Sequence, residues 1–245
     1  MAAPNALQPT TALSERVLLP GDPGRALMLA ESLLDGAKMF NHNRGLWGYT
    51  GLAPDGEPLT IQSTGIGGPS AAVVVGELVD LGARHLLRVG TCGALVPGLG
   101  LGDLVIVTEA IAADGTSRAL GASDRVPASR DLLDVVTAAA DPPFPKPDDD
   151  VHSVHRGPVA TTDLFYDDRG LEHEWAAAGA LAVEMESSAL FALAAARSVQ
   201  AAALLVVSDI VFPERVRIGQ EELRAAERRM GEAALRALTA GARTA

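Results

Sequence analysis

The feature that most constrains the fold is an alternation of short apolar runs with longer amphipathic stretches, which begins near residue 17 and continues to the end of the chain. The runs VLLP, LTIQS, HLLRVG and ALLVV are rich in Val, Ile and Leu, as buried strands are. The stretches between them have the apolar spacing of helices. This alternation predicts an α/β fold, a central sheet covered by helices on both faces. We expect one domain over residues 1–245, in which residues 1–16 form an N-terminal arm.

Turn residues stand at the ends of three expected strands. After the first strand, Gly21 and Asp22 form a tight turn, and Pro23 is expected at the first helical position, where its missing N–H costs nothing. The segments TGIGGPS and GTCG follow the second and third strands. Residues 141–150, DPPFPKPDDD, predict an exposed loop after a helix over residues 130–140.

Composition excludes several classes of protein. Acidic residues outnumber basic ones by 31 to 20, and the formal net charge of −11 would repel a nucleic-acid backbone. The single cysteine, Cys92, excludes an intramolecular disulfide framework. No apolar run reaches a membrane-spanning length, and residues 1–16 lack the pattern of a signal peptide. We therefore expect a cytoplasmic protein with neither a nucleic-acid nor a membrane partner.

The common cofactor and metal motifs are weak or absent in the sequence. TGIGGPS has Ser70 where a dinucleotide fingerprint has its third glycine, and neither a P-loop motif nor a nucleophile elbow occurs. Among the five histidines only His152 and His155 are close together, and their spacing on an expected strand places them on opposite faces. We expect neither a metal nor an organic cofactor.

Arginines beside the glycine-rich turns are candidates for an anion site. Arg25 lies in the expected first helical turn after Gly21, and Arg88 ends a strand directly before GTCG, where Thr91 adds a hydroxyl. Helix N-termini, hydroxyl groups and guanidinium forks together suit oxyanions. Arg44, in NHNRGLWGYTG, is a third candidate. An ordinary surface position stays open for Arg25 and Arg44, whereas the apolar run before Arg88 favours burial beside an anion.

Two acidic motifs lie next to apolar runs. In AVEMESSAL, Glu184 and Glu186 flank Met185. They are either site carboxylates or acids favoured at a helix N-terminus. In VVSD, Asp209 follows Ser208 at the end of an apolar strand. Asp209 either caps the next turn or is an acid at the carboxyl edge of the sheet, where open α/β sheets bind ligands.

Seven segments, taken in their order and approximate spacing, carry a resemblance to one family. They are LPGDPGR, RGLWGYTG, STGIGGPSAAVVVGEL, LLRVGTCGAL, ATTDLFY, VEMESSALFALAA and VVSD. Together they resemble the bacterial-type nucleoside phosphorylases, the family of hexameric purine nucleoside phosphorylase and uridine phosphorylase. The chain is most similar to the purine members, and the resemblance implies a mixed central sheet flanked by helices.

The resemblance also implies a site in three parts. Its phosphate-binding residues would be Gly21, Arg25, Arg88, Thr91 and, from a neighbouring subunit, Arg44. Its ribose-binding residues would be Met185, Glu186 and, again from a neighbour, Asn5, which stands where purine members commonly have a histidine. Its base-binding residues would be Phe165, Glu184, Ser208 and Asp209.

Asp209 is the predicted acid catalyst. A departing purine carries negative charge and needs a proton or a hydrogen bond at N7, which is the work of a general acid. Pyrimidines have no N7, so an aspartate here favours purines. The resemblance pairs Asp209 with Arg228 of AAERR. Arg215, Arg217 and Arg224 stay open as alternatives, because the segment between Asp209 and Arg228 is longer than in the family.

The predicted reaction is phosphorolysis of a purine ribonucleoside to free base and ribose 1-phosphate, with inorganic phosphate as co-substrate. Positive charge builds on the sugar as the glycosidic bond loosens, and bound phosphate stabilises that charge and then attacks. The resemblance implies a homo-oligomer, a hexamer built as a trimer of dimers. The alternatives are a uridine phosphorylase, a methylthioadenosine-type phosphorylase or nucleosidase, and a catalytically silent nucleoside-binding protein.

Overall fold

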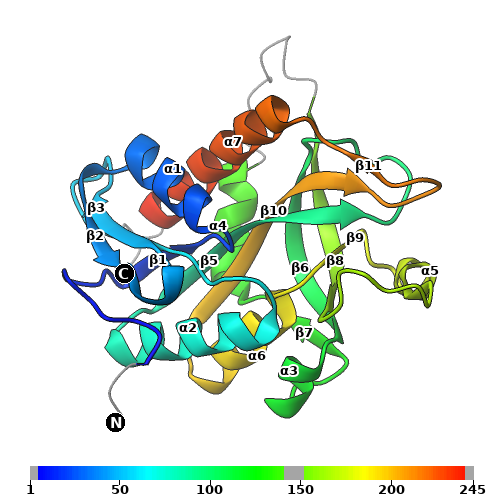
Figure 1. Ribbon diagram of the computed structural model, residues 1–245, viewed down its shortest axis with the longest axis horizontal. Coiled ribbons are helices and arrows are strands. Elements are labelled where there is room, and N and C mark those ends of the chain that lie inside the picture. The colour runs from blue at the N-terminus through cyan, green and yellow to red at the C-terminus, as the bar shows by residue number, and fades with distance from the viewer. Residues whose placement is uncertain (1–4, 141–151, 241–245) are drawn as a thin grey trace.

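The computed structural model describes residues 5–140 and 152–240, so the segment 141–150, expected to be a loop, lies outside the described residues (Figure 1). Within the described residues, 11 strands form one sheet. They are β1 (Arg16–Leu19), β2 (Asp35–Asn41), β3 (Gly48–Leu52), β4 (Pro58–Gln62), β5 (His85–Ala94), β6 (Leu104–Ala113), β7 (Arg125–Pro127), β8 (Val154–Thr162), β9 (Ala182–Glu184), β10 (Gln200–Ile210) and β11 (Val216–Arg217).

The sheet is mixed, as expected, and part of it closes on itself. Strands β4, β1, β5 and β10 lie side by side and run parallel, so their carboxyl ends meet at one edge. Strand β10 also pairs with β6, and β9 joins β8 to β5. With the β6–β8 pairing, strands β5, β10, β6, β8 and β9 form a ring. The alternation in the sequence predicted the strands but not this closure.

Helices cover two sides of the sheet (Figure 1). On one side α1 (Pro23–Leu33), α4 (Arg130–Ala140) and α7 (Gln220–Ala240) pack together, and on the other α2 (Gly68–Leu81), α3 (Gly115–Ala119) and α6 (Ser187–Ala196) pack together. The short helix α5 (Leu171–Ala177) lies beyond β8 and β9. The predicted α/β fold with helices on both faces is confirmed. None of the helices described is both long and apolar enough to cross a membrane.

Burial of the central strands explains their composition. Residues 204–207 of β10, all Leu or Val, have no exposed surface, because neighbouring strands and helices cover both faces of the sheet. Directly after them the β5–β10 register shifts between Val207 and Asp209. Such a bulge re-aims side chains beside it. It lies where the predicted base-binding residues Ser208 and Asp209 follow the apolar run.

Candidate active site

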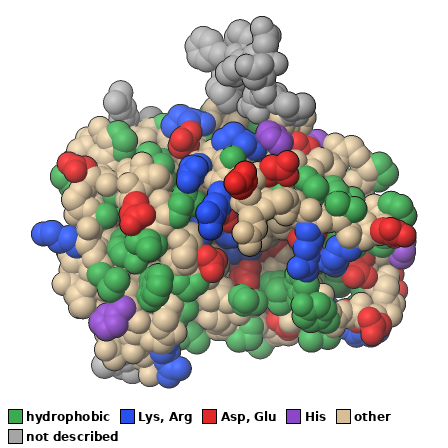
Figure 2. Space-filling view, turned by 45° about the horizontal axis from the view of Figure 1, so that its top comes forward, with side chains coloured by type: hydrophobic (Ala, Val, Ile, Leu, Met, Phe, Trp, Pro, Cys, Tyr) green, Lys and Arg blue, Asp and Glu red, His purple; other side chains and the backbone are tan. Residues whose placement is uncertain are grey.

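A pocket of about 770 Å³ opens at the carboxyl edge of the parallel strands. Its walls come from the turn after β1, the 3-10 turn at Asn43–Gly45, the end of β5, the segments after β8 and β9, and the end of β10. In Figure 2 acidic and basic side chains gather around the hollow near the middle of the face. Nearly all the predicted site residues line this pocket: Gly21, Arg25, Arg44, Arg88, Thr91, Phe165, Glu184, Met185, Glu186, Ser208 and Asp209.

The turn after β1 brings Arg25 to the pocket from the first turn of α1. Pro23 begins the helix, and the Asp22 carboxylate accepts a hydrogen bond from the Arg25 amide at 2.7 Å, as an N-cap does. Gly21 lies so close to Gly65 that a Cβ on it would be 3.3 Å from the Gly65 carbonyl oxygen. The Arg25 guanidinium donates to Oε1 of Glu227, with Nε at 2.8 Å and Nη2 at 2.7 Å.

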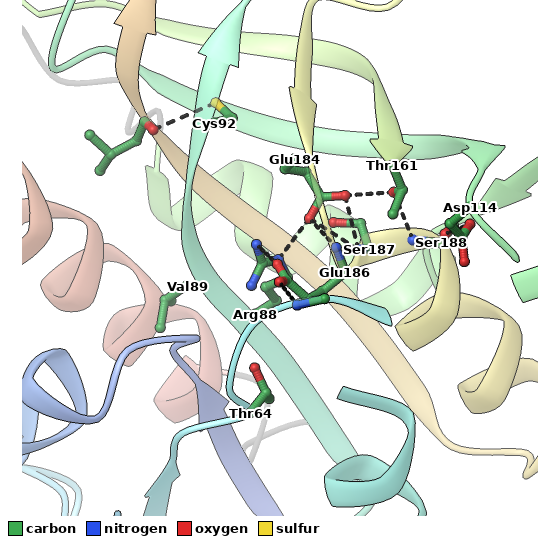
Figure 3. A network of polar contacts seen from close by, with 12 residues as sticks. Thr64, Arg88, Val89, Cys92, Asp114, Thr161, Glu184, Glu186, Ser187 and Ser188 are labelled. Atoms are coloured by element: carbon green, nitrogen blue, oxygen red, sulfur yellow. Dashed lines mark hydrogen bonds and ion pairs between the residues drawn. The ribbon is translucent and has the colours of Figure 1, made fainter. Parts of the chain in front are cut away.

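Arg88 is buried on β5 and contacts two carboxylates (Figure 3). Its Nε donates to Glu184 Oε2 at 3.0 Å, and its Nη2 pairs with Glu186 Oε2. Burial by itself would lower the pKa of Arg88, but the charges of Glu186 and Glu184 raise it further, so the guanidinium stays protonated. The guanidinium folds over Gly90, where an added Cβ would lie 2.8 Å from Arg88 Cζ. Only glycine leaves room for this conformation.

Glu184 lines the pocket, and several neighbouring groups donate hydrogen bonds to its carboxylate. Its side chain has no exposed surface. Its carboxylate accepts from the Thr161 hydroxyl at 2.5 Å and from the backbone amides of Glu186 and Ser187 at 3.0 Å, at the start of α6 (Figure 3). These contacts hold the carboxylate in place at the pocket wall, and its base-binding role stays a prediction. The hydrogen bonds from the two backbone amides are those of an acid at a helix N-terminus, which was the alternative for this residue.

Glu186 also lines the pocket. Its Oε1 accepts from the Gly67 amide at 2.5 Å, and its Oε2 contacts Arg88. Burial raises the pKa of Glu186, the Arg88 guanidinium opposes that shift, and the nearby Glu184 carboxylate adds to it. A carboxylate in this position has spare lone pairs for ligand hydroxyl groups.

Asp209, which lines the pocket near the end of β10, contacts two arginines of the β11 segment. Arg217 Nε donates to Asp209 Oδ1 at 2.9 Å, and Arg215 Nη1 lies 3.6 Å from the same oxygen. The Ser208 hydroxyl donates to Asp209 Oδ2 at 2.8 Å. The predicted pairing with Arg228 is wrong for this structure. Arg228 is exposed on α7, whereas Arg217 is the direct cross-strand partner of Asp209 in the β10–β11 ladder.

Aromatic residues form the pocket wall beside these two arginines. Phe165 is 43% exposed, stacks edge-on against Tyr166, and lies beneath the Arg215 and Arg217 guanidinium groups at 5.2 and 5.6 Å. These are cation–π distances. Cys92 also lines the pocket, and burial raises the pKa of its thiol well above the usual range, so it stays a neutral thiol.

The two residues predicted to serve a neighbouring subunit differ in position. Arg44 is exposed at the rim of its own chain's pocket, with φ of 57°, a left-handed conformation that is uncommon for residues other than glycine. Asn5 does not line the described pocket. The backbone amides of Asn5 and Leu7 donate to the Glu77 carboxylate of α2, at 2.8 and 2.7 Å. The carbonyl oxygen of Asn5 accepts from the Asn43 side chain.

Several residues that line the pocket, and one that contacts Arg25 from outside it, were not predicted from the sequence. Tyr166 follows Phe165 directly, and Glu172 and Trp175 come from α5, whose segment LEHEWAA has helical spacing but no motif that marks a ligand. Glu227 lies behind Arg25 and immediately precedes Arg228 in AAERR. The one signal for Glu227 is its place on the otherwise apolar buried face of α7.

Comparison with known proteins places the chain in a family. The sequence profile described as the phosphorylase superfamily matches residues 15–240. The purine nucleoside phosphorylase DeoD-type of Geobacillus kaustophilus is 36% identical over 222 residues, which cover 90% of this chain and 89% of that protein. The protein of the same name from Caldanaerobacter subterraneus is 40% identical over 206 residues, covering 80% and 83%.

Solved structures show the same relationship. The uridine phosphorylase of Vibrio fischeri superimposes with a TM-score of 0.80 at 30% sequence identity, over 93% of this chain and 93% of that one. A family profile that spans the sheet, the pocket and most of α7, together with relatives above 30% identity over most of the chain, leads to one conclusion. The chain belongs to the phosphorylase superfamily.

Proposed function

We propose that the protein is a purine nucleoside phosphorylase, which cleaves purine ribonucleosides with inorganic phosphate to give free base and ribose 1-phosphate. One observation carries the proposal: a single pocket is lined by Arg25 and Arg88, by the carboxylate of Glu186, and by an aspartate paired with arginine, Asp209. The names of the relatives at 36–40% identity support the same assignment.

The phosphate end is proposed to hold the attacking anion. Arg25 and Arg88 both line the pocket. Arg25 contacts one carboxylate and Arg88 contacts two, and each guanidinium keeps further N–H donors. Gly21 and Thr91 border the same end. Charge-assisted hydrogen bonds from two or three guanidinium groups suit a phosphate dianion.

The sugar and base are proposed to lie along the pocket from Glu186 to Asp209. Glu186 accepts from the ribose hydroxyls, and Met185 packs against the furanose. As the bond between C1′ and the base nitrogen breaks, a phosphate oxygen bonds to C1′ and Asp209, which takes up a proton from solvent when the nucleoside binds, gives that proton to N7 of the departing purine. Arg217 and Ser208 orient the carboxyl group toward the base, and Phe165 stacks on it.

Uridine phosphorylase is the second candidate, because a solved neighbour of that name shares the fold. Asp209 favours the purine reaction, since an acid placed at the base end has a purine N7 to protonate and finds no such atom in uracil. A hydrolytic nucleosidase is less well supported, because water as the attacking group does not require arginines at the phosphate end.

The active assembly is proposed to be a homo-oligomer, a hexamer made of three dimers, in which Arg44 and Asn5 complete the site of a neighbouring subunit. Both lie on the same edge of the molecule, linked through Asn43 and Glu77. We propose a cytoplasmic enzyme that uses no cofactor besides inorganic phosphate. Dialysis against a metal chelator should then leave the rate unchanged.

The test is a panel of nucleosides with and without phosphate. Purified protein is incubated with inosine, guanosine, adenosine, methylthioadenosine and uridine, and the products are identified by chromatography. Phosphate-dependent release of a purine base supports the proposal. Faster release of uracil than of any purine would favour the uridine enzyme, and equal rates without phosphate would favour a nucleosidase.

A further inference from the structure

Glu227 is a buried carboxylate that no part of the proposed reaction uses. It lies on α7, and its side chain is 10% exposed. Its neighbours on the buried face of the helix are Ala226, Met230, Ala233 and Ala234. Placing a single charge on such a face is costly unless the charge is paired. The partner of Glu227 is Arg25, 202 residues earlier in the chain.

The geometry of the Glu227–Arg25 pair fixes the guanidinium. One oxygen, Oε1, accepts from both Nε at 2.8 Å and Nη2 at 2.7 Å. The third nitrogen, Nη1, is 3.5 Å from the Val89 carbonyl oxygen of β5. Two anchors on different elements therefore define the plane of the guanidinium, and α1 and α7 lie side by side to allow this (Figure 1).

Glu227 contacts Arg25 from behind. Arg25 is among the residues that line the pocket, whereas Glu227 is not among the described residues that do so. The remaining N–H groups of Arg25 are thus free for an anion in the pocket. Arg88 is held in a similar way, because Glu184 contacts its Nε from a position with no exposed surface. Each of these arginines therefore has a buried carboxylate that accepts from its Nε.

We propose that Glu227 is a positioning residue for phosphate, which acts by holding the Arg25 guanidinium in the orientation that an anion in the pocket requires. This inference rests on the proposed function of the pocket. The role is distinct from two others that a buried carboxylate can have. A purely electrostatic Glu227 would weaken phosphate binding by its charge, and a purely structural one would tie α7 to α1 with no effect on phosphate.

Two substitutions at position 227 separate these roles. Glu227→Gln keeps an oxygen where Oε1 accepts both Arg25 donors but removes the negative charge. Glu227→Ala removes the charge and the acceptor together. Positioning predicts that phosphate binds the Gln variant at least as tightly as the parent and the Ala variant roughly 10- to 100-fold more weakly. The charge role predicts tighter binding by both variants, and the structural role predicts no change in either.

The experiment measures phosphate binding by calorimetry and, separately, the KM for phosphate, the KM for inosine and kcat. Glu232→Ala, at an exposed position on the same helix, is the matched control. We expect Glu227→Ala to weaken phosphate affinity and to raise the KM for phosphate. The KM for inosine should stay within about twofold of the parent, since the sugar and base contacts are untouched. In an Arg25→Ala background, Glu227→Ala should have no further effect on phosphate affinity.

The outcomes are decisive in either direction. Equal phosphate affinity in Glu227→Ala and the parent, or an undiminished effect of Glu227→Ala in the Arg25→Ala background, overturns the inference. If Glu227→Ala does not fold, Glu227→Asp takes its place, because it keeps the charge but withdraws the acceptor from Arg25 by one methylene. Weaker phosphate binding by Glu227→Asp supports the inference, and unchanged or tighter binding overturns it. A parent that binds phosphate in this Glu227-dependent way but cleaves no nucleoside would refute the proposed function alone. A parent that shows phosphate-dependent turnover with no effect of Glu227 would refute the inference alone.

Discussion

Asp209 and Arg217 are direct partners across the antiparallel strands β10 and β11, with Arg217 Nε 2.9 Å from Asp209 Oδ1. The bulge in β10 lies just before this pair. The acid role proposed for Asp209 requires that its carboxyl group be held in one orientation, and the pairing with Arg217 across the two strands holds it.

The first prediction tests which arginine serves Asp209. Arg217→Ala should lower kcat with inosine by roughly 10-fold or more, a share of the 10²–10⁴-fold that a positioned acid contributes. Arg228→Ala should stay within about twofold of the parent, because Arg228 is exposed on α7 and the ion pairs of Asp209 are with Arg215 and Arg217. Steady-state kinetics of both variants check this. A larger loss of kcat in Arg228→Ala than in Arg217→Ala would show that Arg228 is the arginine that serves Asp209.

The second prediction separates acid catalysis from binding. Asp209→Asn keeps the size of the side chain but cannot deliver a carboxylic proton, so kcat with purine nucleosides should fall by roughly 10²–10⁴-fold. A 7-methylated purine nucleoside is already cationic and leaves without protonation at N7. The variant should therefore cleave it almost as fast as the parent does. Similar losses on both substrates would mean that Asp209 only shapes the pocket.

How much of the site the sequence could predict depends on how local each part is. Gly21 with Arg25 belongs to a strand-turn motif at the carboxyl end of β1, as expected. Arg88 and Thr91 were expected at a strand end and in the turn after it, but both lie inside β5, which continues to Ala94 because it pairs with β10 along this whole segment. The structure brings all four residues into one pocket. The partner of Arg25 is 202 residues away and has no local signal. The pairing of Asp209 with Arg217 depends on the register of a short hairpin, which apolar periodicity does not encode.

The fold shows the same division. Helix α4 begins and ends at the residues that its periodicity indicated, and the buried strands β5 and β10 lie where the apolar runs are. Strands β2 and β3 were not predicted, because DGAKMFN and GYTGL contain no apolar run of strand length. The ring was not predicted either, since it requires β10 to pair with both β5 and β6.

The third prediction concerns subunits. If Arg44 serves a neighbour, mixing inactive Arg44→Ala chains with inactive Glu186→Ala chains restores activity, because each mixed dimer has one site with both residues. Random exchange at equal amounts should give roughly a quarter of the parent rate. Arg44 also lies at the rim of its own pocket. No recovery after confirmed subunit exchange would show that it serves its own chain.

The fourth prediction concerns pH and the N-terminal segment. Burial would raise the pKa of Glu77, but the amides of Ala6, Asn5 and Leu7 and the charge of Arg44 lower it below its usual range. A lowered pKa in the folded state means that the stabilisation is present above the unfolded pKa, about 4.3, and is lost as pH falls through the folded value.

Glu77→Gln should therefore destabilise the protein by about 1 kcal/mol at neutral pH, a typical value for a partly exposed hydrogen-bonded group. The difference from the parent should shrink as pH falls below the unfolded pKa of about 4.3 and through the lower pKa of Glu77 in the folded protein, because Glu77 of the parent then becomes protonated. Urea unfolding of both proteins across this range measures it. A difference that does not depend on pH would contradict the account of the Glu77 carboxylate.

Phosphorus NMR of the parent protein with inosine and orthophosphate tests the central claim most directly, because it observes the new bond between phosphate and sugar. The account predicts that a phosphomonoester signal of ribose 1-phosphate grows in step with free hypoxanthine, and that no hypoxanthine forms when phosphate is left out. Hypoxanthine that accumulates equally fast without phosphate, with no new phosphoester signal when phosphate is present, would contradict it.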